Sequence, residues 1–469
     1  MAEYKIKKGV GIIPKGITEI EDYAFSDCTD LTKVVIPNSV TELGRSAFRG
    51  CTNLTEIVIP DSVTEIGDYA FDKCTSLTKV VIPDSVTRIG DMPFRDCTSL
   101  TEISVAEGNP VYDSRNNCNA IIETESNILI YGCATTVIPD SVTIIGARAF
   151  DGCTGLTKIV IPDSVTKVRK GSFYCCTGLT EVVISNSATI IGAWAFAGCT
   201  GLTKIVIPDS VTKIGVSAFR DCTSLTKIVI PDSVTKIRED TFWDCTSLKD
   251  IVISNSVTEI GQGAFAGCTG LTEIIIPDSV TEIGERAFDC CKGLTKIVIP
   301  DSVTKIGEMA FDYCTSLKEI VIPDSVKKFE YGAFRHCVGL TKVVIPESIT
   351  GIAEDAFKDC TSLTEIVIPK KVKRIGKQAF NNCTSLKEIT LLCPIEFKKS
   401  FLNGCESLTT ITLAAKIKKF AEGFFKGCPN LKTIYVPAET AEYYKHLIPY
   451  ALHSKIVELP AEKKKKTKK

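Results

Sequence analysis

Apolar residues recur along this chain in one fixed order, and a clear copy is PDSVTKIGVSAFRDCTSLTKIVI at 208–230. The alternation around Ile228 and Ile230 predicts a short strand with these two side chains inward and their neighbours outward. The next residues, Pro-Asp-Ser, favour a turn, and proline lacks the N–H that a strand ladder needs. From Val211 to Cys222 the apolar spacing fits a bend and one or two helical turns, too short to be stable alone. Each unit must therefore pack against the next.

The unit returns with a period of 23 residues, which is typical of a solenoid whose units bury their apolar faces against one another. The period is interrupted once, before Phe150. A phenylalanine marks each repeat: Phe25, Phe48, Phe71, Phe94, Phe150, Phe173, Phe196, Phe219, Phe242, Phe265, Phe288, Phe311, Phe334, Phe357 and Phe380.

The run L-x-x-I-x-I-P-x-S-V at 225–234 resembles the leucine-rich repeat. Its continuation, I-G-x-x-A-F-x-x-C-T-x-L, is similar to the BspA-like subfamily known from bacterial surface proteins and anaerobic protists. The resemblance covers nearly the whole chain. It implies an α/β repeat solenoid, a horseshoe or curved rod, with a parallel β-sheet on the concave face and short helical turns on the other side. Ser233 stands where the general pattern usually has Asn, so serine is the candidate to replace the Asn ladder of other families.

Since each coil of a solenoid contacts only its neighbours, we expect a single solenoid domain over 1–460. A terminal helix over Glu439–Leu447 is expected to cover the open end of the core. The expected segments are a lead-in at 1–12, regular repeats at 13–105, an irregular insertion at 106–136, regular repeats at 137–389, degenerate repeats at 390–430, a C-terminal cap at 431–460 and a basic disordered tail at 461–469.

The insertion at 106–136 contains two apolar runs around a Glu-Ser turn, which predict a hairpin. One alternative is an irregular coil that keeps the core continuous. The other is a binding protrusion that carries Tyr112, Arg115 and Tyr131.

Cysteine is frequent, with 22 residues, and 17 of them fall at the cysteine position of the repeat. Buried cysteine behaves as a small hydrophobe, so we expect a core stack of free thiols. Metal binding is not expected, because there is no C-x-x-C pair and the chain has 3 histidines. The cysteines outside the register are candidates for exposed thiols or a local bridge: Cys118, Cys133, Cys175, Cys290 and Cys393.

The outward side chains of the predicted strands form a charged row and an apolar row. Opposite charges mostly alternate, and each cross-strand pair contributes roughly 0.2–1 kcal/mol. An exposed apolar row of this length marks an interaction site or an aggregation risk. The candidate partner-binding residues on this concave face are Lys158, Val160, Glu181, Val183, Lys204, Val206, Lys227, Val229, Asp250, Val252, Glu273, Ile275, Lys296 and Val298.

Nothing in the sequence favours catalysis, since no histidine stands with a nucleophile and no Gly-rich phosphate loop follows a strand. We expect no cofactor, no small-molecule substrate and no transmembrane segment. The net charge of −1 gives no general attraction to nucleic acid.

Three hypotheses remain, all of them non-catalytic. The resemblance implies an adhesin-like or host-interacting protein at the cell surface or secreted, with extracellular-matrix or plasma proteins as the partner class. The absence of a signal peptide and the free thiols favour an intracellular scaffold or effector, cytoplasmic if the chain is full length. The apolar row also permits structural self-association.

Overall fold

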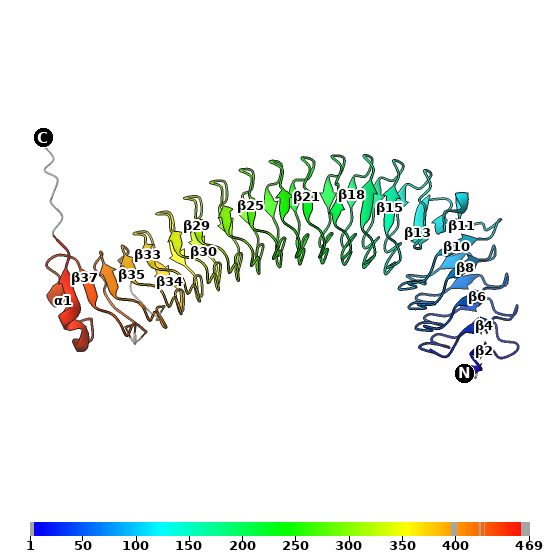
Figure 1. The fold of residues 1–469 in the computed structure, drawn as a ribbon, viewed down its shortest axis with the longest axis horizontal. Coiled ribbons are helices and arrows are strands. Elements are labelled where there is room, and N and C mark those ends of the chain that lie inside the picture. Colours follow the sequence, from blue (N-terminus) through cyan, green and yellow to red (C-terminus); the bar gives the residue numbers. More distant parts are fainter. Residues whose placement is uncertain (1–3, 395–400, 422–423, 426, 461–469) are drawn as a thin grey trace. The chain divides into compact units, whose positions relative to one another are not determined.

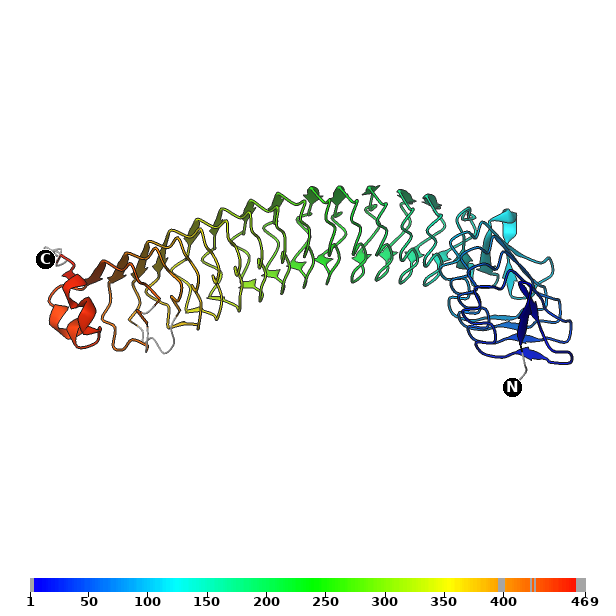
Figure 2. The ribbon, with the colours of Figure 1, turned by 60° about the horizontal axis from the view of Figure 1, so that its bottom comes forward.

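The computed structural model describes residues 4–394, 401–421, 424–425 and 427–460. The chain divides into two compact units, Met1–Val252 and Ile253–Lys469, here called unit 1 and unit 2. In each unit the chain winds in coils, and most coils carry two strands on different sides (Figures 1 and 2). The strands of one series are called here the longer strands, although one of them, β19 (Lys204–Ile205), has two residues, and those of the other series are the two-residue strands. The expected tail at 461–469 and part of the degenerate repeats lie outside the described residues.

The longer strands of unit 1 form two sheets, one on each side of the insertion. The two-residue strands before the insertion form a sheet of their own, whereas four of those after it share a sheet with the strands of the insertion. The longer strands are β1 (Lys5–Lys7), β2 (Val10–Ile12), β4 (Lys33–Val35), β6 (Glu56–Val58), β8 (Lys79–Ile82), β10 (Glu102–Val105), β15 (Lys158–Ile161), β17 (Glu181–Ile184), β19 (Lys204–Ile205), β21 (Lys227–Val229) and β23 (Asp250–Val252). The two-residue strands are β3 (Glu19–Ile20), β5 (Glu42–Leu43), β7 (Glu65–Ile66), β9 (Arg88–Ile89), β14 (Ile144–Ile145), β16 (Lys167–Val168), β18 (Ile190–Ile191), β20 (Lys213–Ile214) and β22 (Lys236–Ile237).

Unit 2 repeats the same coil and ends in a small cap. Its longer strands are β25 (Glu273–Ile275), β27 (Lys296–Val298), β29 (Glu319–Val321), β31 (Lys342–Val344), β33 (Glu365–Ile368), β35 (Glu388–Leu391), β36 (Thr410–Leu413), β37 (Thr433–Val436) and β38 (Ile456–Glu458). The two-residue strands are β24 (Glu259–Ile260), β26 (Glu282–Ile283), β28 (Lys305–Ile306), β30 (Lys328–Phe329), β32 (Gly351–Ile352) and β34 (Arg374–Ile375). The helices are α1 (Ala441–Lys445) and the 3-10 helix η2 (Tyr450–Lys455).

Apart from the antiparallel pair of β1 and β2, the longer strands pair in parallel, about one repeat apart, as in the pairing of Lys158 with Glu181. Their inward residues are buried: Ile228 and Ile230 are each 1% exposed. Between them, Val229 is 46% exposed, as the two-residue period of a strand requires. The predicted repeat solenoid of stacked parallel strands is therefore confirmed.

The third side of each coil, called here the turn side, is not helical where the structure describes the repeats. Along this side the backbone N–H groups of successive residues alternate between two acceptors. One N–H donates to a carbonyl of the next coil, and the following N–H donates to a carbonyl three residues earlier in its own coil. Phe219 donates to the carbonyl of Thr241 in the next coil (3.0 Å), whereas Arg220 donates three residues back to Ser217 (3.2 Å). Ser217 and Asp221 have φ of 54° and 58°, a left-handed conformation that ends a right-handed helix. The expected helical turns are thus replaced by a chain of turns.

Side-chain ladders tie each coil to the one before it. The Ser233 hydroxyl donates to the carbonyl of Val211 (2.6 Å), so serine does replace the Asn ladder here. The Cys222 thiol donates to the carbonyl of Phe196 (3.1 Å). The phenylalanine rings stack along unit 1 after the insertion, with 5.6 Å between the ring centroids of Phe196 and Phe219. The core is therefore a set of parallel rows along the stack.

The insertion contains β11 (Tyr112–Asp113), the 3-10 helix η1 (Arg115–Asn117), β12 (Ala120–Glu123) and β13 (Ile128–Gly132). The strands β12 and β13 form an antiparallel hairpin. The strand β13 then pairs in parallel with β14 of the next coil. The hairpin therefore continues the stack of two-residue strands.

The helix α1 lies within the range expected for the terminal helix. Its Tyr444 is fully buried, and the hydroxyl donates to the carbonyl of Ala415 (2.9 Å) and accepts from the N–H of Ile417 (2.9 Å). The helix is thereby fixed onto the last coils of unit 2. The strand β38, which the sequence pattern did not indicate, pairs with β37.

Candidate functional site

The outward surface of the longer strands, called here the strand face, carries the predicted charged row in unit 1. Lys79 Nζ lies 2.5 Å from Glu102 Oε1, and Lys158 Nζ lies 2.9 Å from Glu181 Oε1. About half of the side-chain surface of each partner in the second pair is exposed, at 56% and 53%. Because water screens such pairs, each contributes about 0–1 kcal/mol. The alternation breaks where Lys204 stands beside a second lysine in register.

The predicted apolar row lies beside the charged row and is exposed. In unit 1, Val206 is 63% exposed, and the whole row there is Val35, Val58, Val81, Val160, Val183, Val206, Val229 and Val252. In unit 2, Ile275 reaches 81%, and the row is Ile275, Val298, Val321, Val344 and Val367. The register prediction for these side chains is confirmed. Within each unit, apolar and charged groups therefore lie in neighbouring lines.

Threonines at the start of the strands are held by the stack itself. The Thr226 hydroxyl donates to the carbonyl of Thr203 in the preceding coil (3.2 Å), and Thr180 does the same to Thr157 (3.0 Å). Their donors are used inside the protein. On the strand face of unit 1, the charged and apolar rows are thus the groups available to a partner.

The three insertion residues proposed for binding make contacts within unit 1. Tyr112 is 7% exposed. The Tyr131 hydroxyl donates to the carbonyl of Gly90 (2.8 Å) and accepts from the N–H of Met92 (2.9 Å). Arg115 pairs with Asp113 at both carboxylate oxygens and donates to the side chains of Asn127 and Ser141, 2.8 and 3.3 Å away.

These bonds give the insertion residues a structural role. Desolvation by burial, the largest effect, raises the pKa of the Tyr131 hydroxyl, which stays protonated. A partner would meet the Arg115 side chain, at 26% exposed, more readily than Tyr112. Binding by this segment remains a prediction.

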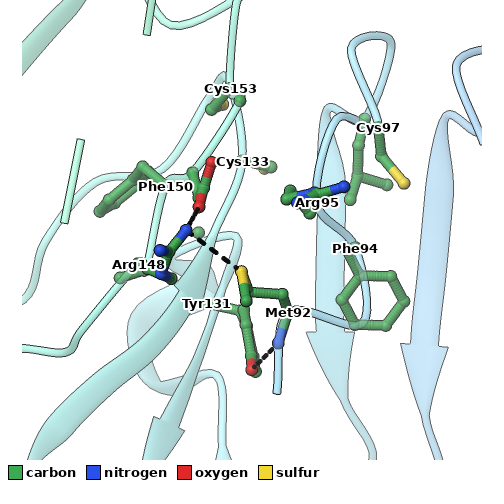
Figure 3. A pocket seen from close by; sticks show the side chains of 14 residues that line it. Met92, Phe94, Arg95, Cys97, Tyr131, Cys133, Arg148, Phe150 and Cys153 are labelled. Atoms are coloured by element: carbon green, nitrogen blue, oxygen red, sulfur yellow. Dashed lines mark hydrogen bonds and ion pairs between the residues drawn. The ribbon is translucent and has the colours of Figure 1, made fainter. Parts of the chain in front are cut away.

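Where the end of β13 meets the neighbouring coils, unit 1 holds a small, partly open cavity of about 20 Å³ (Figure 3). Tyr131 takes the place of the next ring, with its centroid 6.2 Å from that of Phe94 in an edge-on contact. Phe150 lies over Gly132, where an added Cβ would stand 2.1 Å from its Cε1. The cavity has room for about one water molecule. It results from imperfect packing where Tyr131 follows Phe94, and it is too small for a ligand.

The turn side carries ion pairs and aromatic contacts that the sequence pattern did not indicate. In unit 1, the buried carboxylate of Asp72 accepts from Arg49 Nε (3.2 Å) and Arg95 Nε (2.8 Å). In unit 2, the His336 ring lies between Asp312 (3.0 Å from Nδ1) and Asp359 (3.2 Å from Nε2). The sequence does contain a signal for the ion pairs of Asp72, because the arginine and the aspartate of each pair stand one period apart. The signal is hard to recognise, since the residue types at these positions change from coil to coil.

The thiols form the expected core stack, and all 22 are free. Burial raises the pKa of the Cys51 thiol and of the Cys153 thiol to about 12 in each case. Thiols of this kind are protonated near neutral pH and unreactive. Of the cysteines outside the register, Cys118, Cys133 and Cys393 are buried, whereas Cys175 and Cys290 are half-buried.

Within the described residues, no group of three or more histidine, cysteine, aspartate or glutamate side chains is arranged to hold a metal ion. The described residues also contain no helix of the length and apolarity that crossing a bilayer requires.

A family model described as "BspA type Leucine rich repeat region (6 copies)" matches residues 11–120, 131–249, 237–364 and 350–465. No curated protein matches the chain.

Several solved structures are similar to this chain. A leucine-rich repeat protein from Bacteroides ovatus has 24% identity, a TM-score of 0.52, and 98% coverage of both chains. One from Eubacterium ventriosum has 26% identity, a TM-score of 0.49, and covers 64% of this chain and 81% of its own. A leucine rich cell surface protein from Faecalibacterium prausnitzii has 31% identity, a TM-score of 0.41, and covers 51% of this chain and 77% of its own. The first of these supports the fold.

Proposed function

The chain belongs to the BspA-type leucine-rich repeat family, and from this premise we propose that it is an adhesin-like or host-interacting protein that binds a protein partner on its strand face. The family is typical of protein–protein interaction and generally non-catalytic. The partner class is extracellular-matrix or plasma proteins, met at the cell surface or after secretion.

The observation that supports this proposal is the exposed apolar row beside the charged row. Val206, at 63% exposed, and Val252, at 53%, belong to it in unit 1. Strand propensity favours valine on a pleated surface, yet the valines of β15 to β23 form an exposed row across a whole sheet, and exposed apolar rows of this kind mark interaction sites. Many equal contacts in one line favour an extended partner surface over a small ligand.

The test is a triple variant, Val206→Lys with Val229→Lys and Val252→Lys, measured for binding to a panel of extracellular-matrix and plasma proteins by surface plasmon resonance. Lysine keeps the strand but places a hydrated charge in the contact, so we expect binding to be lost. The control is the matched triple threonine variant, which keeps the β-branched shape. Equal binding by the wild type and the lysine variant would exclude the strand face.

Self-association is a second candidate, favoured by the charge order on the first sheet of unit 1. The order Lys33, Glu56, Lys79, Glu102 is self-complementary when two copies meet antiparallel, because each lysine then faces a glutamate. Light scattering over a range of concentrations and salt tests it. A monomer at every concentration would exclude this role.

A further inference from the structure

A second, chemically different surface lies on the turn side of unit 1, away from the strand face. It is a cavity of about 370 Å³, within the range of about 300–1,000 Å³ usual for small-molecule sites. Six residues from four successive turn segments line it: Arg95, Arg148, Lys170, Gly171, Tyr174 and Trp194.

The cavity exists because a glycine interrupts a row of larger side chains. Arg148, Gly171 and Trp194 occupy the same position of three consecutive repeats, and all have positive φ, at 57°, 62° and 60°. An added Cβ on Gly171 would lie 3.3 Å from Arg148 Cγ and 3.7 Å from Tyr174 Cβ. A side chain there would therefore grow between the arginine and the tyrosine, into the space that the cavity occupies.

The two arginines are held from outside the cavity by carboxylates that do not line it. Arg148 Nη1 donates to Asp151 (2.6 Å), and Arg95 donates to Asp72 through Nε (2.8 Å) and Nη2 (3.1 Å). These bonds fix the guanidinium groups and leave further N–H groups of each arginine without a protein acceptor among the described residues. Fixed N–H donors at a cavity wall favour an anionic group of the ligand.

Three cations and no carboxylate line the cavity, and Arg148 is paired with Asp151. Asp72 is shared by Arg95 and Arg49, so one carboxylate serves two cations. Asp96 adds a second carboxylate 3.6 Å from Arg95. Lys170 is exposed, and its ammonium group makes no ion pair in the described part of the chain. It is therefore the one lining cation whose charge no neighbouring carboxylate compensates there.

The aromatic residues are placed to contact the faces of a non-planar ring. The Tyr174 and Trp194 rings meet at 59° with centroids 6.2 Å apart, so they form a corner and leave no parallel gap for a flat base. One side of each ring is covered by a guanidinium, that of Arg148 for Tyr174 (5.9 Å) and that of Arg220 for Trp194 (6.0 Å). The C–H face of a pyranose fits such a corner.

We propose that this cavity, opened by Gly171 between Arg148 and Trp194, is a binding site for an acidic sugar, a pyranose that carries a carboxylate or a sulfate. The ring packs against Tyr174 and Trp194, and the acidic group meets Lys170 and the arginines. The site goes beyond the proposed protein binding and uses a different side of the coil, so the strand-face lysine variants leave it unchanged.

The experiment is calorimetric titration of the full chain with N-acetylneuraminic acid, glucuronic acid and a sulfated disaccharide, and with glucose as the neutral sugar. The first two probes carry a carboxylate and the third a sulfate, which separates the two sources of charge. AMP and phosphotyrosine test a planar aromatic anion. We expect at least one acidic sugar to bind, and glucose at least about tenfold more weakly, because the charge-assisted hydrogen bonds are missing.

Two variants with matched controls locate the site. Gly171→Asn fills the cavity and keeps positive φ, which Asn tolerates, and Lys170→Gln removes the uncompensated charge. Each is expected to weaken acidic-sugar binding at least about tenfold. The controls are Gly332→Asn, at the same repeat position in unit 2 with φ of 58°, and Lys167→Gln on the strand β16. Both are expected to bind as the wild type does.

Four results would overturn the proposal: no acidic sugar binds, glucose binds as tightly, AMP or phosphotyrosine binds more tightly, or Lys170→Gln changes nothing. Lys170 is exposed, so the Lys170→Gln protein folds whatever happens to Gly171→Asn. Circular-dichroism unfolding curves of each variant verify the fold. Loss of protein binding in the strand-face variants with unchanged sugar binding separates the two proposals.

Discussion

The strand face and the turn side of unit 1 are built by the same repeat, yet one is uniform and the other changes from coil to coil. On the strand face, a charged residue and a valine recur at fixed positions. On the turn side, one position with positive φ is occupied in turn by Met92, Arg148, Gly171, Trp194 and Ser217. The backbone there is fixed by bonds to the next coil, so the side chain is not needed for the fold and is free to vary.

This difference separates two kinds of recognition. A uniform face offers many equal weak contacts, whose sum depends on how many a partner meets at once. A variable side offers single places with their own shape and charge, such as the gap at Gly171.

The largest effect on stability is expected from alkaline pH, which deprotonates the buried cysteine thiols behind the turn side when the protein unfolds. Burial raises the pKa of the Cys51 thiol from 9.0 to about 12. The folded state thus holds the proton more tightly, so stability is complete below pH 9.0 and falls as the pH rises toward about 12. Each pH unit costs up to about 1.4 kcal/mol per buried thiol. Urea unfolding at about pH 8 and about pH 10.5 measures the loss in the free energy of unfolding. Equal values at the two pH values would contradict the presence of a buried row of protonated thiols.

The next effect is the loss of one ring from the phenylalanine row. Phe219 is fully buried, with its ring centroid 5.6 Å from those of Phe196 and Phe242. Phe219→Ala should lower the free energy of unfolding by about 3–5 kcal/mol, because it leaves a cavity between two rings. Denaturant unfolding measures this loss. The strand-face control, Val206→Thr, should stay within about 0.5 kcal/mol of the wild type.

A smaller effect separates two serines at the same position of the repeat. The Ser233 hydroxyl donates to the carbonyl of Val211, whereas the buried Ser164 hydroxyl has no hydrogen-bond partner among the described residues. Ser233→Ala should lower the free energy of unfolding by about 1 kcal/mol, while Ser164→Ala is neutral or stabilising. The denaturant midpoints of the two variants, each compared with that of the wild type, measure this difference. An equal loss in the two variants would mean that the hydroxyl bond contributes nothing.

The smallest effect is expected on the strand face. Lys158 and Glu181 are both more than half exposed, so a double-mutant cycle with Lys158→Ala and Glu181→Ala should give a coupling of about 0–1 kcal/mol that falls with salt. A coupling that is larger and insensitive to salt would mean that the charged row stabilises the stack. It would then be less available to a partner.

The strand face could be predicted from the sequence because strand geometry has one register. Once Ile228 points inward, Val229 must point outward, and the exposed fraction of 46% follows from this alternation. The ion pair of Lys158 with Glu181 follows from the same register and a fixed period. These contacts join equivalent positions of consecutive repeats, so they can be predicted from the sequence once the period is known.

The turn side could not be predicted in the same way. The spacing of Val211, Ile214 and Ala218 fits a helix, but the N–H groups there find better partners in the next coil, which requires positive φ at Ser217. The Tyr131 hydroxyl reaches Gly90, 41 residues earlier, across an interruption of the period. Such contacts depend on where whole coils lie in space.

The side-chain ladders give the stack a direction. The hydroxyls of Thr226 and Ser233 and the thiol of Cys222 all donate to carbonyls of the coil before their own. A coil that leaves the ribosome therefore meets acceptors that are already in place, and needs nothing from the residues still to be made for these bonds. For these side-chain bonds the order of synthesis and the order of assembly coincide, whereas a turn-side N–H such as that of Phe219 has its acceptor only when the next coil has been made.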